Sequence, residues 1–501
     1  MRILLKGFTA DGINEPSRMA VLVENDRIIA VEKDIYGSCA ADKIIEFNDE
    51  VIAPGFIDAH GHSDISILAH PKAESKRFQG ITCEITGNCG LSAFPITPMN
   101  KEHLENLYSN YGIPLSWDDL NGYYDTLRKS SAGLRIYSLC GHNTLRSAVA
   151  GYEKEEISSS ELNEMESLLR QSLSCGTPGL STGLLYTPGC FAQKAEITAL
   201  MRVLAEYDAV YATHLRSEGD HLLESLEETL SAARESGLKK VLISHLKTAG
   251  KCNWHKLPAA LKLIDDYRAK GIDIRFDRYP YTESQTMLSV ILPPPFDTMP
   301  DRDITIKLQD PALREKLYRQ LAAEKTEEDW QRWRITGTTH PEWKNFIGKK
   351  YSELPGNVEI AVIDQLAFDA VTATIGAAGM SQKNMLKIIT HPLCMGGSDG
   401  NALPASAKTS SHPRAFGAIA KFIRIKLDHG ESIGSTINKV TASPAQFFSL
   451  KENGLIRNGK KADLCIFSPE EIDSKADFTS PCRLADGIRL TMLDGKIEYY
   501  F

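Results

Sequence analysis

The sequence predicts an α/β protein in which a (β/α)8 TIM barrel is joined to a small β-sandwich-like domain formed by both chain ends. Strand and helix signals alternate through the middle of the chain, some of the strands end in histidine, and both ends are rich in β-structure. Repeated βα units suit a barrel whose polar strand ends form the active-site face. A doubly wound open sheet is the alternative, but no Gly-x-Gly-x-x-Gly follows an early strand.

The middle of the chain carries the clearest βα pattern. Ala209-Val-Tyr-Ala-Thr-His214 reads as a strand, and apolar residues then recur at helical spacing from Leu222 to Ala233 before Gly237. Lys240-Val-Leu-Ile-Ser-His245 reads as the next strand. His214 and His245 are therefore one βαβ period apart, about 30 residues, and we expect both at the same end of a barrel.

The two chain ends resemble each other. Short apolar runs at 20–23 and 27–31 are joined by a hairpin signal. At the other end, the runs 462–467, 490–493 and 496–501 read as strands, and Asp494-Gly495 between the last two is a hairpin signal. We therefore expect residues 1–52 and 440–501 to form the small β domain and residues 53–439 to form the barrel.

A segment from about 292 to 355 interrupts the βα rhythm. It opens with three consecutive prolines, continues with a charged helical stretch from Pro311, and carries Trp330 and Trp333. A long insertion at the active-site end of a barrel is often a lid. A surface elaboration without a catalytic role is the alternative.

Composition narrows the class of partner. The formal net charge is −8 and no basic stripe is present, which argues against nucleic acid and anionic membranes. The N-terminus has only three consecutive apolar residues, too few for a signal peptide. No apolar run approaches the roughly 18 to 20 residues that span a bilayer. The ten cysteines form no Cys-x-x-Cys pair, so we expect mostly reduced thiols in a cytoplasmic protein.

An apolar run ends in Asp58, His60 and His62. Residues two apart in a strand project from the same face, so two imidazoles at the end of a strand are placed to close on one metal ion. A pair of surface histidines in a turn is the alternative. With His214 and His245, four histidines lie at expected strand ends, and together they favour a metal site.

Cys89 and Asp399 extend this predicted site. Cys89 follows a strand at 81–85 within a glycine-flanked turn, and a thiolate beside histidines selects zinc. Cys83 is the competing cysteine, but its place inside the strand favours a packed core residue. Asp399 closes a late strand, where a carboxylate facing a metal-activated water has the chemistry of a general base. A turn is the alternative for Asp399-Gly400.

Seven motifs in order resemble the N-acyl-D-amino-acid deacylases (D-aminoacylases) of the amidohydrolase superfamily over nearly the whole chain. They are His60-Gly-His62, Thr86-Gly-Asn-Cys-Gly90, Thr213-His-Leu-Arg216, Ile243-Ser-His-Leu-Lys247, Tyr279-Pro-Tyr-Thr282, Gly397-Ser-Asp-Gly400 and His412-Pro-Arg414. Two C-terminal motifs, Thr441-Ala-Ser-Pro-Ala445 and Gly459-Lys-Lys-Ala-Asp463, fit the small β domain of the superfamily.

The resemblance implies roles for the site residues. Cys89, His214 and His245 would hold one tightly bound zinc ion, while His60 and His62 would line a second, weaker metal position. Many superfamily relatives bridge two metals with a carboxylated lysine, but residues 179–186 contain none. Asp399 would be the general acid/base. Lys247, Tyr281, Ser284 and Arg414 would bind the α-carboxylate of the substrate.

The resemblance also implies hydrolysis of N-acyl-D-amino acids to a carboxylate and a free D-amino acid. Members acting on N-acyl-D-glutamate place an arginine soon after the Leu-Pro segment, whereas this chain has Leu292-Pro-Pro-Pro-Phe296, which favours a neutral or apolar side chain. Glu283 departs from the small residue common in the family; facing the pocket, it would favour a cationic D-residue. The rivals are a dipeptidase cleaving aminoacyl-D-amino acids, a cyclic-amide hydrolase and a non-catalytic barrel scaffold.

Overall fold

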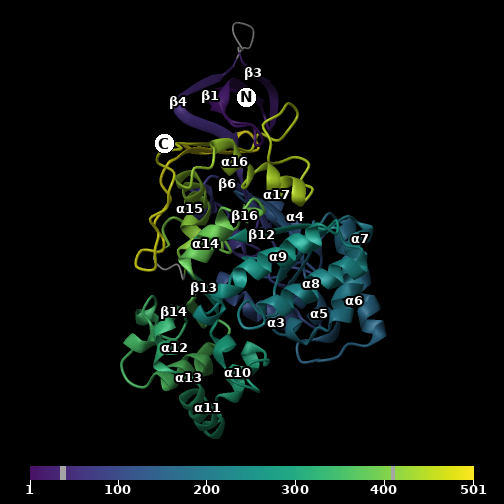
Figure 1. Cartoon of the computed structure of the whole chain (residues 1–501), viewed down its shortest axis with the longest axis vertical. Coiled ribbons are helices and arrows are strands. Elements are labelled where there is room, and N and C mark those ends of the chain that lie inside the picture. Colours follow the sequence, from purple (N-terminus) through teal and green to yellow (C-terminus); the bar gives the residue numbers. More distant parts are fainter. Residues whose placement is uncertain (34–40, 408–411, 501) are drawn as a thin grey trace.

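The computed structural model describes residues 1–33, 41–407 and 412–500 and has a closed barrel at its centre (Figure 1). Eight parallel positions form the barrel, with β7 and β8 sharing the third. The strands are β5 (Phe56–Asp58), β6 (Ile81–Thr86), β7 (Arg135–Ser138), β8 (Cys140–Gly141), β9 (Gly179–Gly183), β10 (Val210–His214), β11 (Lys240–Ile243), β12 (Asp273–Arg278) and β16 (Cys394–Gly396). The Ala59 N–H donates to the Gly396 carbonyl at 3.0 Å and joins the first strand to the last. The predicted TIM barrel is confirmed.

Helices follow the barrel strands along the chain. They are α1 (Ser66–Ala69), α2 (Glu74–Arg77), α3 (Lys101–Leu107), α4 (Leu120–Ser130), α5 (His142–Ala150), α6 (Ser159–Ser174), α7 (Lys194–Glu206), α8 (Leu222–Ser236), α9 (Leu257–Arg268), α14 (Gln382–Ile389), α15 (Arg414–Asp428), α16 (Ile433–Asn438) and α17 (Ala442–Phe447). In α8, Leu222, Leu226 and Leu230 are fully buried on one face, and Gly237 ends the helix with φ +78°. The helical spacing read from the sequence therefore describes the buried face of α8.

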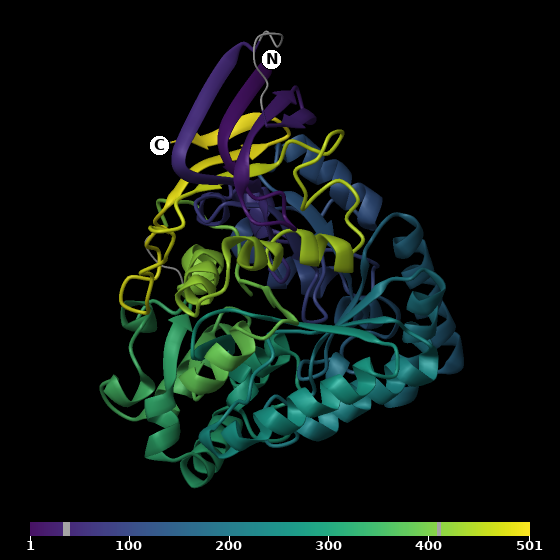
Figure 2. The ribbon, with the colours of Figure 1, turned by 45° about the horizontal axis from the view of Figure 1, so that its top comes forward.

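Both chain ends contribute to one seven-stranded mixed sheet (Figure 2). Its strands are β1 (Arg2–Thr9), β2 (Ser17–Glu24), β3 (Arg27–Glu32), β4 (Lys43–Pro54), β17 (Leu464–Phe467), β18 (Ile488–Leu493) and β19 (Lys496–Tyr500). The order β19-β18-β17-β4-β1-β2-β3 places the N-terminal and C-terminal groups side by side. Their junction is the antiparallel pair β4–β17, in which Leu464 faces Pro54 and Phe467 faces Val51.

A unit inserted between β12 and β16 projects at the opposite end of the molecule from the terminal sheet (Figure 1). It contains β13 (Glu283–Met287), β14 (Trp333–Gly337), β15 (Thr374–Ala378), α10 (Asp301–Lys307), α11 (Pro311–Glu324), α12 (Glu327–Arg332) and α13 (Val358–Asp369). The unit has its own hydrophobic cluster, which runs from Leu288 to Ile375. The residues of this cluster begin before the expected insertion at 292–355 and continue after it, so the inserted unit is longer than expected at both ends.

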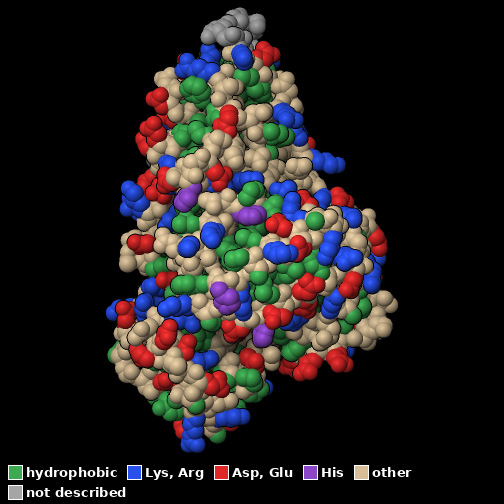
Figure 3. Space-filling model, viewed as in Figure 1, with side chains coloured by type: hydrophobic (Ala, Val, Ile, Leu, Met, Phe, Trp, Pro, Cys, Tyr) green, Lys and Arg blue, Asp and Glu red, His purple; other side chains and the backbone are tan. Residues whose placement is uncertain are grey.

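The surface carries mixed charge. Lys and Arg side chains alternate with Asp and Glu side chains over the face shown in Figure 3. Among the helices of the described residues, none combines the length and apolar character needed to cross a bilayer.

Candidate metal centre and cavity

The first barrel strand ends before His60 and His62, although one strand face was expected to carry Asp58 and both histidines. Strand β5 stops at Asp58, so Asp58, His60 and His62 do not share one strand face. The Asp58 carboxylate turns instead to the Ser398 N–H at 2.8 Å. His60 and His62 nevertheless reach the same place, because Asp399 Oδ1 lies 3.6 Å from His60 Nε2 and 3.0 Å from His62 Nε2.

Cys89 is brought to the centre by a tight turn after β6. Gly87, Cys89 and Gly90 all have positive φ, and Cys89 has φ +52°. A Cβ at Gly90 would lie 2.1 Å from Asn143 Oδ1, and one at Gly87 would lie 2.1 Å from the Leu139 carbonyl oxygen. The turn therefore requires both glycines.

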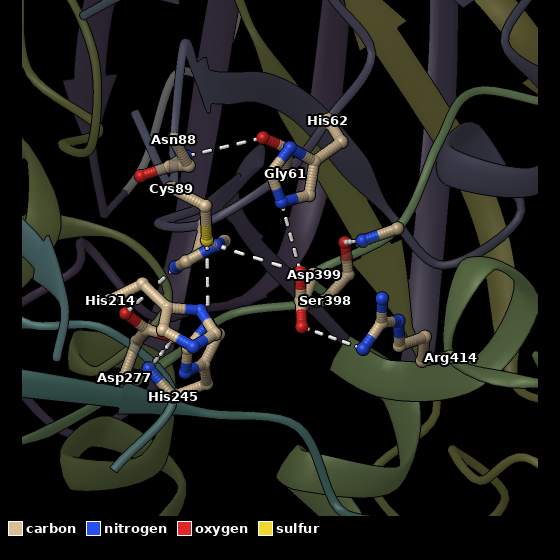
Figure 4. A network of polar contacts seen from close by, with 12 residues as sticks. Gly61, His62, Asn88, Cys89, His214, His245, Asp277, Ser398, Asp399 and Arg414 are labelled. Carbon is tan, nitrogen blue, oxygen red and sulfur yellow. Dashed lines mark hydrogen bonds and ion pairs between the residues drawn. The ribbon is translucent and has the colours of Figure 1, made fainter. Parts of the chain in front are cut away.

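A buried thiol and imidazoles meet at this point (Figure 4). Cys89 Sγ lies 3.5 Å from His60 Nε2 and 3.4 Å from His245 Nε2. One ligand atom from each of His60, Cys89, His245 and Asp399 lies within 4.8 Å of the others. Burial alone would raise the pKa of the Cys89 thiol, but His60 and His245 lower it, and the net pKa lies well below its ordinary value. The two imidazoles therefore favour the thiolate form of Cys89.

His214 belongs to an overlapping group with His245 and Glu218. Glu218 Oε1 lies 2.9 Å from His245 Nδ1, and Glu218 Oε2 lies 3.5 Å from His214 Nε2 and 2.7 Å from Lys247 Nζ. Within the described part of the chain, neither ring nitrogen of His214 has a hydrogen-bond partner. A buried imidazole left in this state is open to a metal ion.

Asp399 stands between the imidazoles and a cation. Its Oδ2 accepts a hydrogen bond from Arg414 at 2.6 Å, while Oδ1 faces His62. Burial by itself would raise the pKa of Asp399, but Arg414 and His62 lower it well below the usual range. Its neighbours therefore hold Asp399 as a carboxylate.

A cavity of about 570 Å³ opens onto this group. Its wall includes His62, Cys89, His214, His245 and Asp399, together with the sequence-predicted Lys247, Ser284 and Arg414. His60 is fully buried behind the wall, where its Nδ1 lies 3.2 Å from Asp277 Oδ2.

Tyr281 is the predicted site residue that the structure places elsewhere. Within the described residues, the cavity wall includes Tyr279 and not Tyr281. Strand β12 ends at Arg278, and the Tyr281 N–H then donates to the Tyr279 carbonyl at 3.0 Å. The chain turns there, and the Tyr281 ring packs under Lys421 of α15, whose Nζ lies 4.7 Å from the ring centre.

Three residues at the site were missed by sequence reasoning. Asp277 lies near the end of β12 and Tyr279 directly after it, so a polar strand end was their available signal. Glu218 lies in the loop after β10, four residues beyond His214, and only its charge sets it apart in the sequence.

The residues present fit a zinc ion. A thiolate and imidazoles are zinc donors of the borderline-soft kind, and they converge in a buried place where, among the described residues, the His214 ring nitrogens have no hydrogen-bond partner. As the resemblance implies, Cys89, His214 and His245 would hold one ion, with His60, His62 and the same thiolate beside a second position. The ligand atoms in the structure fall into two sets that share His245. Glu218 and Asp277 are placed to orient His245 and His60, because a ligating imidazole is commonly held by a carboxylate at its other nitrogen.

We predict that Cys89→Ser lowers the zinc content of the purified protein to well under half of the wild-type ratio, because a hydroxyl is a poor zinc ligand. Atomic spectroscopy of dialysed protein measures the ratio. Cys83→Ala is the control, since Cys83 is buried in β6 and burial raises the pKa of its thiol. Equal zinc in the Cys89 variant and the wild type would contradict the assignment.

Comparison with known proteins gives relatives over the whole chain. A family model described as the amidohydrolase family matches residues 364–499. The chain is 31% identical over 499 residues to N-acyl-D-glutamate deacylase of Alcaligenes xylosoxydans xylosoxydans, covering 98% of this chain and 91% of that protein. It is 30% identical over 506 residues to D-aminoacylase of the same organism, covering 98% and 93%.

A solved structure agrees with this likeness. The crystal structure of N-acyl-D-glutamate deacylase from Bordetella bronchiseptica, complexed with zinc and a phosphonate inhibitor, matches with a TM-score of 0.82 and 28% identity, covering 99% of this chain and 96% of that one. The chain therefore belongs to the N-acyl-D-amino-acid deacylase family of the amidohydrolase superfamily and is a zinc-dependent enzyme that deacylates N-acyl-D-amino acids.

Proposed function

We propose that this deacylase acts on N-acyl-D-amino acids with a neutral or apolar side chain, and that Asp399 is its general acid/base. The observation that carries the proposal is the position of Asp399 in the cavity wall. One of its carboxylate oxygens faces the imidazoles and the other is held by Arg414.

Asp399 has the charge and surroundings that proton transfer needs. As an ionised carboxylate it takes a proton from the attacking water and later delivers that proton to the departing amide nitrogen. When bound, zinc supplies a Lewis acid that polarises a carbonyl and acidifies water. The products are a carboxylate and a free D-amino acid.

The α-carboxylate of the substrate has a cationic receptor in the same cavity. Lys247 Nζ lies 6.0 Å and the Arg414 guanidinium carbon 5.0 Å from the centre of the Tyr279 ring. Tyr279 Oη is buried and has no hydrogen-bond partner within the described residues. Two cations and a hydroxyl that is available to donate a hydrogen bond suit a carboxylate. Anchoring that group on one side of the scissile bond selects one enantiomer.

The inserted unit supplies an apolar wall for the substrate side chain. Met287, Val290, Ile291 and Ile375 line the cavity. Glu283 does not line it; its two oxygens accept hydrogen bonds of 2.7 and 3.0 Å from Arg334. The ion pair with Arg334 neutralises the charge of Glu283, which would otherwise have favoured a substrate with a cationic D side chain. The apolar wall favours a neutral or apolar substrate side chain instead.

Lys325 supports a second candidate class of substrate, N-acyl-D-amino acids with an acidic side chain. It lines the cavity, and its Nζ lies 5.8 Å from the centre of the Trp333 ring. A substrate carboxylate near Trp333 would meet this cation. We favour the neutral class because more of the inserted unit's wall is apolar than cationic.

A panel of N-acetyl amino acids tests the proposal. We expect zinc-loaded protein to hydrolyse the D enantiomers of N-acetylmethionine and N-acetylleucine with kcat/KM at least about tenfold above N-acetyl-D-glutamate. The L enantiomers should not turn over. Preference for N-acetyl-D-glutamate would favour the Lys325 alternative, and faster cleavage of glycyl-D-methionine would favour a dipeptidase.

Asp399→Asn should lower kcat by about 100- to 10,000-fold, the range for loss of a general acid/base. The amide keeps the shape of the side chain, so zinc content should stay at the wild-type ratio. Steady-state kinetics and metal analysis on one preparation measure both. If zinc is lost together with activity, Asp399 is a ligand and its assignment as the base is wrong.

Tyr279→Phe and Tyr281→Phe form a matched pair, because each removes one buried hydroxyl two residues apart. Tyr279→Phe should raise KM by about tenfold, which corresponds to a lost hydrogen bond to a charged group. Tyr281→Phe should leave KM near the wild-type value. The reverse result would restore Tyr281 to the carboxylate site.

A further inference from the structure

Lys76 of α2 is fully buried within a cluster of charges behind the cavity. Its Nζ lies 2.8 Å from Asp58 Oδ2 and 3.1 Å from Glu84 Oε2, and all three side chains have zero exposure. None of them lines the cavity among the described residues. Burying three charges is costly, and removal of one partner leaves the others uncompensated. Their position next to the strand ends of the metal centre suggests what the cluster does.

The cluster holds the chain on both sides of Asp399. Lys76 Nζ donates to Ser398 Oγ and to the Gly400 carbonyl, each at 2.8 Å. The Asp58 carboxylate accepts from the Ser398 N–H at 2.8 Å and from its hydroxyl at 2.5 Å. The residues before and after Asp399 are therefore tied to the same buried charges.

The cluster also contacts the loop that carries His60 and His62, called the histidine loop below. Glu84 accepts hydrogen bonds from the Ser63 N–H at 3.0 Å and from its hydroxyl at 2.9 Å, directly after His62. The two loops bond to each other as well, because the Asp399 N–H donates to the His60 carbonyl at 2.7 Å and the His62 N–H donates to the Gly400 carbonyl at 3.0 Å. Gly400 thus receives one bond from the histidine loop and one from Lys76.

Asp399 needs such support because its backbone has φ +52°, in the left-handed region. A non-glycine residue persists there only when its surroundings over-determine it. The hydrogen bond of its own N–H and the hydrogen bonds at Ser398 and Gly400 hold the Asp399 backbone in this conformation. They thereby place the carboxylate between His62 and Arg414.

We infer that Lys76 is a positioning residue for Asp399, acting through Ser398 and Gly400 to fix the carboxylate against the imidazoles. The inference rests on the proposed role of Asp399 as general base. A displacement of a reacting group by about 1 Å lowers turnover by up to about 100-fold. Loss of Lys76 should therefore affect the chemical step and leave substrate binding largely intact.

The test compares wild-type protein with the double variant Lys76→Met/Glu84→Gln. Burial raises the pKa of Glu84 to about 7. Replacing this carboxyl by glutamine prevents it from becoming a second uncompensated buried anion once Lys76 is gone, and the Asp58 carboxylate that faces Ser398 is not substituted. We expect kcat to fall about 10- to 100-fold, with KM within about twofold of wild type and the zinc ratio unchanged. The Asp399 loop should also loosen.

Hydrogen–deuterium exchange measures that loosening without any activity assay. Backbone amides of residues 396–402 should exchange at least about tenfold faster in the double variant, because local opening there loses one or more hydrogen bonds of about 1.4 kcal/mol each. Unchanged exchange in this peptide overturns the inference, whatever the kinetics show. An unchanged kcat overturns it as well.

Lys426→Met is the matched control. Lys426 is also fully buried, but it donates to the Ile389 carbonyl at 3.0 Å and pairs with Glu431 at 2.7 Å, near the end of α15. It should lower the melting temperature and leave both kcat and the 396–402 exchange unchanged. If it lowers kcat as much as the double variant does, Lys76 acts only through stability. If wild-type protein hydrolyses no N-acyl-D-amino acid while the exchange still increases, the proposed function fails and the positioning of Asp399 stands.

Discussion

A buried thiolate beside imidazoles is the interaction on which the site depends. Cys89 Sγ has His60 and His245 nitrogens within 3.5 Å, and Cys89 is buried apart from its place in the cavity wall. Such a charge is stable in a protein interior only beside cations or a metal ion. Three separate strand ends must therefore meet at one point. The left-handed backbone of Cys89, His245 and Asp399, with φ of +52°, +36° and +52°, shows how sharply the chain turns to bring them there.

The parts of this arrangement that are local in sequence were predictable. Strand β10 ends at His214 as expected, and the helical spacing from Leu222 describes the buried face of α8. The barrel follows from such units, because parallel strands joined by helices place their carboxyl ends together. The five metal-ligating candidates and Asp399 could therefore be chosen from strand ends and turn glycines alone, and the structure brings all six to one centre.

The rest depends on where strands stop and on contacts between distant residues. Tyr279 and Tyr281 are two apart, so strand alternation would put them on one face, but β12 has already ended at Arg278 and the chain turns between them. Lys76 meets Ser398 across 322 residues. A lysine in the short polar helix α2 gives no sign of full burial, because the carboxylates that compensate its charge come from β5 and β6.

The terminal sheet has a consequence for the order in which the chain is made. Strand β4 bonds to β1 on one side and to β17 on the other, and β17 lies about 400 residues later. At about 5–20 residues per second, a ribosome takes roughly 20 to 80 seconds to supply it. During that time the apolar edge of β4 from Val51 to Pro54 is an unpaired template for other strands. The edge of β4 that pairs with β17 therefore stays open far longer during synthesis than the edge that pairs with β1.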